Sequence, residues 1–454
     1  MKIFNSLTGK KETFKPKIKN EVSIYICGLT PYDDVHIGHA RTFINFDVIV
    51  KFLRFIGFKV KYVRNITDVD DKIINRAKEE GIPALDFSRK YIDEMHNDFF
   101  SLGIESPDIE PKVSDHIDEI ISMIQSLEEK GYAYRKDESD VYFDIQKFKD
   151  YGKLANRTLD QMSAAERTIT DLNKNHEADF VLWKIDTDGI TWPSPWGEGR
   201  PGWHIECSAM SIKYLGEEFD IHGGGLDLKF PHHENEIAQA KCATEKEFAS
   251  LWMHTGPLRI EDKKMSKSLK NFITVKNILK DFHPEVLRLF FLLTHYRSPI
   301  SYSKEGLENA KRVLDKFYTL FSNVKMPKKF NLDQSFKKNF ISTFQDDFNS
   351  PKAISLLQAY AGNSESHLDT LTDKLCTLKV LLNSLGLLLD EAENYFKYGE
   401  LDLSDEEIKK LISDRDNARE NRNFDLADKI RNQLSQKGIV LEDLNGKTVW
   451  KKKS

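Results

Sequence analysis

The chain has 454 residues, of which 40% are hydrophobic and 31% are charged, and its formal net charge is −5. A chain of this length exceeds what one hydrophobic core usually serves, so we expect two to four domains. The net negative charge argues against indiscriminate nucleic-acid binding, although a locally basic surface can still bind phosphates. The N-terminus has no apolar stretch of signal-peptide length, and the longest apolar run, around Val286 to Leu293, is too short to span a bilayer. We therefore expect a cytoplasmic protein without a membrane segment.

The cysteines are few and widely scattered. They occur at Cys27, Cys207, Cys242 and Cys376, without the local pairing of a disulfide framework or a zinc finger. This scatter favours reduced thiols, some of which are open to metal binding.

The first third of the chain predicts a parallel α/β sheet. Residues 22–28 form a buried strand pattern, residues 36–57 have helical periodicity, and a second strand pattern near residues 59–67 precedes another helix. Ligands of such sheets bind at the carboxyl ends of the strands. Cys27, the HIGH string at His36–His39 and the segment Asn65–Asp68 all fall at such ends, which predicts the location of a site.

The pattern changes twice further along. Charged helices and a Trp-, Pro- and Gly-rich stretch fill the region up to Gly202, and strand and helix patterns then resume. Beyond Pro299 amphipathic helices dominate, and two basic helices follow near the C-terminus. The pair Asn445-Gly446 between apolar runs predicts a β-hairpin.

Two short strings carry most of the functional information. HIGH at His36–His39 and KMSKS at Lys264–Ser268 are each weak alone, and either could be a chance tetrapeptide or a solvated basic turn. Their order, their separation and the strand pattern before each resemble the paired ATP-binding signatures of class I aminoacyl-tRNA synthetases. The resemblance implies amino-acid activation by adenylation.

A second set of motifs, CGLTPYD, GWHIECSAM and FPHHENE, is similar to the cysteinyl-tRNA synthetases through nearly the whole chain. This resemblance implies that L-cysteine and ATP with Mg²⁺ form cysteinyl-adenylate, from which the cysteinyl group passes to the 3′ end of tRNA(Cys). It implies an α/β fold, with a Rossmann-like parallel-sheet catalytic domain, an inserted connective region, a helical bundle and a small C-terminal anticodon-binding module. We accordingly expect the first catalytic half at 1–114, the insertion at 115–202, the second half at 203–262, the KMSKS loop and stem-contact region at 263–323, the bundle at 324–400 and the anticodon module at 401–454.

Adenylation requires negative charge to be neutralised at the phosphates of ATP. His36 and His39, three residues apart at a helix start, face the same way and can donate to phosphate oxygens, while Gly38 leaves room for the nucleotide. Lys264 and Lys267 can close on the β and γ phosphates. By family analogy Lys267 is the surest ATP contact of the two.

Cys27, Cys207, His232 and Glu236 match the zinc ligands of the family one for one, which implies one Zn²⁺ per subunit. Without the resemblance, the cysteines would read as buried apolar residues and His232 as a core histidine. With it, we expect the substrate thiolate to bind this zinc, which explains selection against serine without editing. The family likeness places Thr67, Trp203 and Asp227 in the amino-acid pocket, with Trp203 equally open to a packing role. His222 and His233 join them as neutral imidazoles near the metal.

For the tRNA we expect contacts from Asp428, Arg431, Asp443 and Trp450, because unpaired bases are read by stacking and by Arg or Asp hydrogen bonds. A solvated helix face is the alternative for each residue taken alone. One rival function is a paralogue that transfers cysteine to an amino-sugar precursor, but such proteins lack the C-terminal module. A second is a non-enzymatic tRNA or nucleotide binder, which would not need all the motif residues. A monomer is expected.

Overall fold

The computed structural model describes residues 1–158, 172–187, 189–260, 263–264, 272–322, 324, 326–362, 371–399, 403–444 and 447–452. The chain divides into two compact units, and each unit is interrupted in sequence. Unit 1 comprises Met1–Leu258, His295–Ile300 and Ile341–Asn349, and unit 2 comprises Arg259–Thr294, Ser301–Phe340 and Ser350–Ser454.

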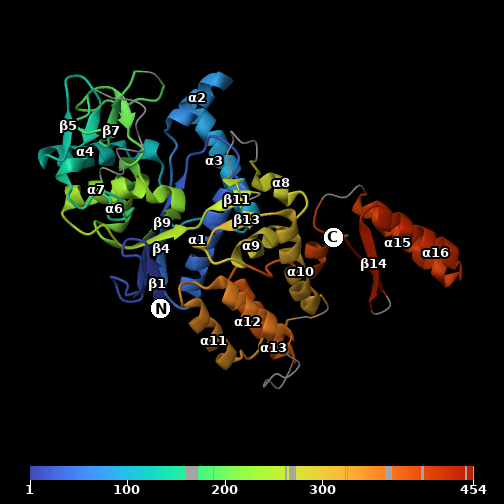
Figure 1. Ribbon diagram of the computed structural model, residues 1–454. Helices are drawn as coiled ribbons and strands as arrows, with labels where there is room; N and C mark the ends of the chain where they lie inside the picture. Colours follow the sequence, from blue (N-terminus) through green and yellow to red (C-terminus); the bar gives the residue numbers. More distant parts are fainter. Residues whose placement is uncertain are drawn as a thin grey trace. The chain divides into compact units, whose positions relative to one another are not determined.

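The centre of unit 1 is a four-stranded parallel sheet in the order β10-β9-β3-β4 (Figure 1). Its strands are β3 (Glu21–Leu29), β4 (Lys59–Ile66), β9 (Phe219–Gly225) and β10 (Ala249–Thr255). Helix α1 (Ile37–Phe55) connects β3 to β4, and α7 (His232–Thr244) connects β9 to β10. The first connection leads from β3 to β4 on one side of the β3–β9 pair, and the second leads from β9 to β10 on the other side. The carboxyl ends of β3 and β9 therefore form the switch point at which open parallel sheets bind their ligands, and the predicted α/β class is confirmed.

Two glycines let this part of the sheet close up. A Cβ on Gly28 would lie 1.6 Å from the carbonyl oxygen of Asn65, and a Cβ on Gly223 would lie 2.4 Å from Cζ of Phe46 in α1. No side chain fits at either distance, so only glycine permits these approaches. As a result β3 and β4 lie close together beside Cys27, and α1 packs directly on β9.

A second, antiparallel sheet in unit 1 has the order β5-β6-β7-β8 and comes from the region predicted as an insertion. Its strands are β5 (Ala133–Arg135), β6 (Val141–Phe143), β7 (Phe180–Ile185) and β8 (Gly199–Pro201). Trp183 and Phe143 of this sheet belong to the same buried cluster as Cys27 and Cys207. The insertion thus shares a hydrophobic core with the parallel sheet, while its predicted boundaries stay a prediction.

Unit 1 has further elements. They are β1 (Lys2–Asn5), β2 (Lys10–Thr13), α2 (Asp71–Glu80), α3 (Ala84–Ser101), α4 (Ile117–Glu129) and α6 (Ile205–Leu215), with short 3₁₀ turns at Val113–Asp115, Ile145–Lys147 and Leu226–Lys229. Of these, α4 and α6 contribute to the hydrophobic core shared by the two sheets, whereas Ile73 and Phe87 of α2 and α3 belong to a separate cluster. Helices α4, α6 and α7 lie side by side (Figure 1).

Unit 2 is mainly helical. A small sheet in the order β12-β11-β13 contains β11 (Leu258–Ile260), β12 (Lys263–Lys264) and β13 (Ile300–Tyr302). The first residue of β11 and the first residue of β13 belong to unit 1. The helices are α8 (Val275–Leu279), α9 (Pro284–Leu292), α10 (Lys304–Phe321), α11 (Gln334–Phe344), α12 (Ser350–Gly362), α13 (Leu371–Asn383), α14 (Ala392–Lys397), α15 (Asp405–Glu420) and α16 (Phe424–Gln436). The antiparallel pair β14 (Ile439–Leu444) and β15 (Lys447–Lys452) flanks Asn445-Gly446, as the hairpin pattern predicted.

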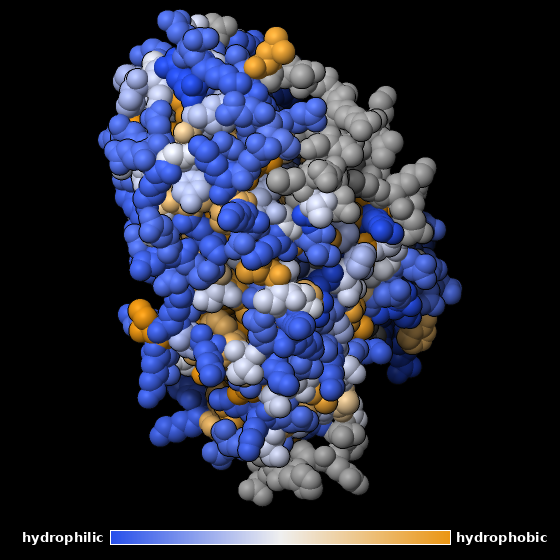
Figure 2. Space-filling view, turned by 60° about the vertical axis from the view of Figure 1, so that its left-hand side comes forward, coloured by the Kyte–Doolittle hydropathy of each residue, from blue (hydrophilic) through white to orange (hydrophobic). Residues whose placement is uncertain are grey.

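The surface seen in Figure 2 is largely hydrophilic, with apolar side chains scattered singly. In the part of the chain that the structure describes, none of the helices has the length and apolarity required to cross a membrane.

Candidate metal and nucleotide site

Four side chains converge at the carboxyl ends of β3 and β9. Cys27 lies on β3, Cys207 in the first turn of α6, and His232 and Glu236 one turn apart on α7. Their candidate ligand atoms all lie within 4.8 Å of one another, and all four residues are buried. The Sγ atom of Cys27 is 3.5 Å from Nε2 of His232 and 3.4 Å from Oε1 of Glu236. We call these four residues the metal cluster.

The donor set of the metal cluster fits zinc. Two sulfur atoms, one imidazole nitrogen and one carboxylate oxygen are ligands that Zn²⁺ accepts in tetrahedral sites. Burial lowers the pKa of His232 to about 3, so its ring is neutral at pH 7 and Nε2 can offer a lone pair. Burial and the neighbouring Cys207 and Glu236 raise the pKa of Cys27 well above its usual value. A divalent cation would relieve that penalty, because it stabilises the thiolate.

Two further histidines orient the cluster. Nδ1 of His204 lies 2.9 Å from Nδ1 of His232, and Nε2 of His222 lies 2.8 Å from Oε2 of Glu236. If Nε2 of His232 binds a metal, its Nδ1 carries the proton and donates to His204. Partners of this kind set the tautomer of a ligand and hold its ring in place.

A second set of candidate ligands overlaps the metal cluster. Cys27, His222, His233 and Glu236 also bring one ligand atom each within 4.8 Å of one another. The Nε2 atom of His222 is already bonded to Glu236, and Nδ1 of His233 lies 2.9 Å from Nε2 of His254. The geometry therefore suits His222 and His233 better as supporting residues than as ligands.

The structure places the three pocket residues taken from the family likeness beside the metal cluster or just after a strand of the parallel sheet. The ring of Trp203 is 43% exposed and its centroid lies 4.5 Å from that of His232. Thr67 is buried just after β4, and its hydroxyl accepts a 3.3 Å hydrogen bond from Nδ2 of Asn65. Asp227 lies exposed in the 3₁₀ turn that follows β9.

The HIGH string begins α1. His36 is the N-cap, and its Nδ1 accepts a 3.1 Å hydrogen bond from the backbone N–H of His39. The two rings stack with centroids 3.4 Å apart and planes 21° apart, so both imidazoles are on one side of the helix start, as the spacing predicted. Gly38 lies between them in the first turn, where N–H groups that have no partner within the helix and the helix dipole favour an anion.

The KMSKS string falls mostly outside the described residues. The backbone of Lys264 ends β12, paired with Arg259 of β11, whereas Met265–Ser268, including Lys267, is not described. The roles of Lys264 and Lys267 stay predictions.

Glu206 is a buried acidic residue beside the metal cluster that no motif marks as a site residue in the sequence. This residue is 1% exposed and precedes Cys207 in α6, and burial, followed by the charges of Cys207, Asp70 and Asp68, raises its pKa well above the usual value. The sequence feature that indicates its burial is an acidic residue in a helix turn whose neighbours are apolar or small.

In the C-terminal module, Asp428 and Arg431 are exposed on α16, as a contact surface requires. Trp450 is not: its ring is 6% exposed and packs with Ile408 and Leu434, with the ammonium of Lys397 5.0 Å from its centroid. The expectation of base stacking on Trp450 is therefore corrected to a core role. The backbone of Asp443 lies in β14, and its side chain is outside the described atoms.

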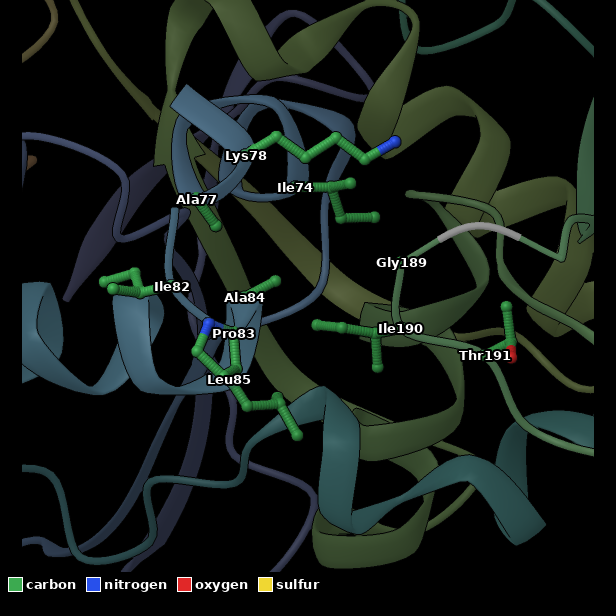
Figure 3. Close-up of a pocket in the computed structure, with 10 residues that line it drawn as sticks. All are labelled: Ile74, Ala77, Lys78, Ile82, Pro83, Ala84, Leu85, Gly189, Ile190 and Thr191. Atoms are coloured by element: carbon green, nitrogen blue, oxygen red, sulfur yellow. The ribbon is translucent and has the colours of Figure 1, made fainter. Parts of the chain in front are cut away.

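A pocket of about 460 Å³ elsewhere in unit 1 lies between the α2–α3 turn and residues 189–191 (Figure 3). Figure 3 shows Ile74, Leu85 and Ile190 around its interior. None of the predicted site residues lines it.

Comparisons with known proteins agree with this geometry. The family described as tRNA synthetases class I (C) catalytic domain matches residues 13–312. The chain is 45% identical over 455 residues to the cysteine–tRNA ligase of Hydrogenovibrio crunogenus, covering 100% of this chain and 99% of that protein. It is 46% identical to the cysteine–tRNA ligase of Idiomarina loihiensis, covering 99% of each. Among solved structures, the Mycobacterium tuberculosis methionyl-tRNA synthetase in complex with methionyl-adenylate has a TM-score of 0.59 at 15% identity, over 80% of this chain and 89% of that chain. At that identity the likeness shows the fold.

Proposed function

The chain belongs to the cysteine–tRNA ligases, a family of class I aminoacyl-tRNA synthetases, and on this premise we propose that its metal cluster holds one Zn²⁺ that selects the substrate. A ligase of this family uses L-cysteine, ATP and tRNA(Cys). The observation that carries the proposal is the convergence of two cysteines, one histidine and one glutamate at the switch point of the sheet. That edge is where a substrate reaches a parallel α/β domain.

Bound zinc would supply a coordination position for the thiolate of cysteine, which the harder hydroxyl oxygen of serine matches poorly. An apolar pocket alone separates such near-isosteres by about 1–3 kcal/mol. Four protein ligands usually mark a closed site, so one of them must bind loosely enough to share its place. Glu236 is suited to this, because Oε2 keeps its hydrogen bond to His222 when Oε1 moves.

The chain's own residues bind and orient the rest of the amino acid. The ring of Trp203 packs against that of His232, and we assign Thr67 and Asp227 to the ammonium and backbone of the substrate. His222 and His233 are buried, and we assign them to holding Glu236 and the pocket wall in place through their contacts with Glu236 and His254.

His36 and His39 are assigned to the ATP phosphates. Their stacked rings and the N-terminus of α1 present several N–H donors on one side, and such donors stabilise charge that builds up during phosphoryl chemistry. Lys264 and Lys267 are proposed to neutralise the β and γ phosphates together with the Mg²⁺ that accompanies ATP.

We propose that the anticodon bases are contacted by Asp428, Arg431 and Asp443. Phe424, at the start of α16, adds an aromatic ring that is 62% exposed, which suits base stacking better than the buried Trp450. A cytoplasmic monomer is the proposed state of the enzyme.

The test is ATP–pyrophosphate exchange with cysteine and with serine, before and after zinc is removed. We expect exchange with cysteine only, lost with the metal and restored by zinc. Exchange that persists in rigorously zinc-free protein would contradict the metal's part in selection, and exchange with no amino acid would contradict the activation chemistry itself.

A further inference from the structure

Arg41 is a fully buried arginine in the helix that carries the HIGH string. It lies in α1 two residues after His39 and is 1% exposed. Its Nη1 donates to the carbonyl oxygen of Pro257 at 2.6 Å, and its Nη2 donates to the carbonyl oxygens of Tyr296, at 3.4 Å, and Ser298. One guanidinium therefore binds two segments that are far apart in sequence.

Those two segments are where the chain leaves unit 1 and returns to it. Unit 1 ends its first stretch at Leu258 and resumes over His295–Ile300. The backbone N–H of Gly256 donates to the carbonyl of Tyr296 at 2.8 Å, and that of Ile300 donates to the carbonyl of Pro257 at 3.1 Å. We call residues 256–257 and 295–300 the roots, because β11 and, beyond it, the KMSKS string continue from Pro257.

The roots approach each other too closely for an ordinary residue at position 256. A Cβ on Gly256 would lie 2.4 Å from the carbonyl oxygen of Ser298 and 2.5 Å from that of Arg297. Of the two carbonyls that crowd this point, that of Ser298 accepts a hydrogen bond from Arg41. A buried acceptor that is left without a donor destabilises the fold.

Burial lowers the pKa of Arg41 to about 10, so the guanidinium is still charged at pH 7. A planar cation with donors in a fixed fork can hold several carbonyls in one geometry, which a lysine cannot do. A second link runs parallel to it, since the hydroxyl of Thr42 in α1 lies 3.0 Å from that of Thr255 at the end of β10.

Residues 295–300 of the roots are also bound by Asp347. This carboxylate is 0% exposed, accepts a 3.0 Å hydrogen bond from the hydroxyl of Tyr296 and binds the guanidinium of Arg297. Asp347 belongs to Ile341–Asn349, the other segment that returns to unit 1. The roots are thus held from two sides, and the bonds of Arg41 join them to α1.

We propose that Arg41 is a positioning residue for ATP activation, which fixes the roots of the KMSKS-bearing segment to the first turns of the HIGH helix. The inference rests on the proposed function, because it assigns both strings to ATP. Arg41 touches no substrate; it sets where the segment that leads to Lys264 and Lys267 begins relative to His36 and His39. A misplacement of about 1 Å can cost on the order of 100-fold in rate.

The test compares Arg41→Met and Arg41→Lys with Arg64→Met. Arg64 is the matched control, because it is a buried arginine of the same unit, 3% exposed, whose guanidinium binds Glu110 at 2.6 Å instead of the roots. For each variant we would measure kcat and KM for ATP in cysteine-dependent exchange, the Kd for cysteine, the zinc content and the melting temperature. The Kd of a non-hydrolysable ATP analogue and hydrogen exchange at the amides of Gly256 and Ile300 complete the set.

We expect Arg41→Met to lower kcat by about 10- to 100-fold and to raise the KM for ATP, with unchanged cysteine Kd and zinc content. The amides of Gly256 and Ile300 should exchange faster. Arg41→Lys should lie between wild type and Arg41→Met, while Arg64→Met should lose melting temperature without this kinetic change. Equal kinetic losses in Arg41→Met and Arg64→Met, or parallel loss of cysteine and ATP binding, would show that Arg41 has only a structural role.

If the wild type shows no exchange, the proposed function fails. The Kd of the ATP analogue and the amide exchange then test the role of Arg41 independently. If Arg41→Met and Arg64→Met give the same values, the proposal for Arg41 is overturned.

Discussion

The Nε2 atom of His222 lies 2.8 Å from Oε2 of Glu236, and neither side chain is exposed to solvent. This hydrogen bond leaves Oε1 facing Cys27 and His232. A buried carboxylate that keeps one fixed partner can change its hold on a metal without becoming an unpaired charge.

Replacing His222 by Phe removes the donor and keeps a ring that can stack on Trp252, as His222 does with centroids 4.3 Å apart. We expect zinc affinity to fall by about 10- to 100-fold, because Glu236 loses its orientation. Competition with a chromogenic chelator measures the effect. His222→Gln, which retains a donor, should lose less, and equal losses in the two variants would contradict the orienting role.

Glu236→Gln tests whether the carboxylate shares its place with the substrate. We expect KM for cysteine in exchange to rise on the order of 10-fold or more, while the variant keeps most of its zinc, since three ligands and a neutral oxygen remain. Zinc content by elemental analysis accompanies the kinetics. Complete loss of zinc would instead make Glu236 a purely structural ligand.

His36→Asn separates catalysis from stability. Asparagine is a favourable N-cap and can replace the hydrogen bond from the N–H of His39, so the melting temperature should change little. If the imidazole of His36 donates to phosphate as proposed, the shorter amide does not replace it at the same point, and kcat for exchange should fall by about 100- to 1,000-fold. Cysteine binding serves as the internal control. A variant with normal kcat would remove His36 from the ATP site.

The burial of His254 predicts an acid dependence of stability in metal-free protein. Burial lowers the pKa of His254 to about 3, whereas an unfolded histidine has a pKa of about 6.5. Below pH 6.5 the unfolded chain therefore binds a proton that the folded chain does not. The free energy of unfolding should fall as the pH drops from about 6.5 toward 3, by at most about 1.4 kcal/mol per pH unit for this residue.

Urea unfolding between pH 7 and pH 4.5 with a chelator present measures that slope. His254→Asn should flatten it, and His96→Asn is the control, since the side chain of His96 is 45% exposed. Equal slopes in wild type and His254→Asn would show that this histidine does not contribute.

In the C-terminal module, Arg431→Ala and Trp450→Ala should have different effects. Arg431 is exposed, so its loss should raise KM for tRNA(Cys) by the equivalent of about 1–3 kcal/mol and leave cysteine-dependent exchange intact. Trp450 is buried, and its loss should cost about 3–5 kcal/mol of stability. Aminoacylation kinetics and melting curves of both variants measure this. An unchanged melting temperature in Trp450→Ala would contradict its core role.

Much of the fold and part of the site could be predicted because they depend on local patterns. The mostly apolar run before Cys27, the helical periodicity after His36 and the Asn445-Gly446 pair indicate a strand, a helix and a hairpin from local patterns alone. The three-residue spacing of His36 and His39 places both rings on one face, which the stacked geometry confirms. Family motifs, and not spacing, supplied the metal cluster, which the structure brings together.

The remaining features depend on which segments meet in space, and no local pattern contains that information. Trp450 was expected at the surface from its residue type, but the helices α15 and α16 cover it. Arg41 reads in sequence as one cation in a helix, and only the fold places the carbonyls of Pro257, Tyr296 and Ser298 around it. The sequence by itself thus determined the elements and the chemistry available. Tertiary packing decided burial, and with it which polar groups become partners, because a group taken out of water must find its hydrogen bonds among the residues that the fold brings next to it.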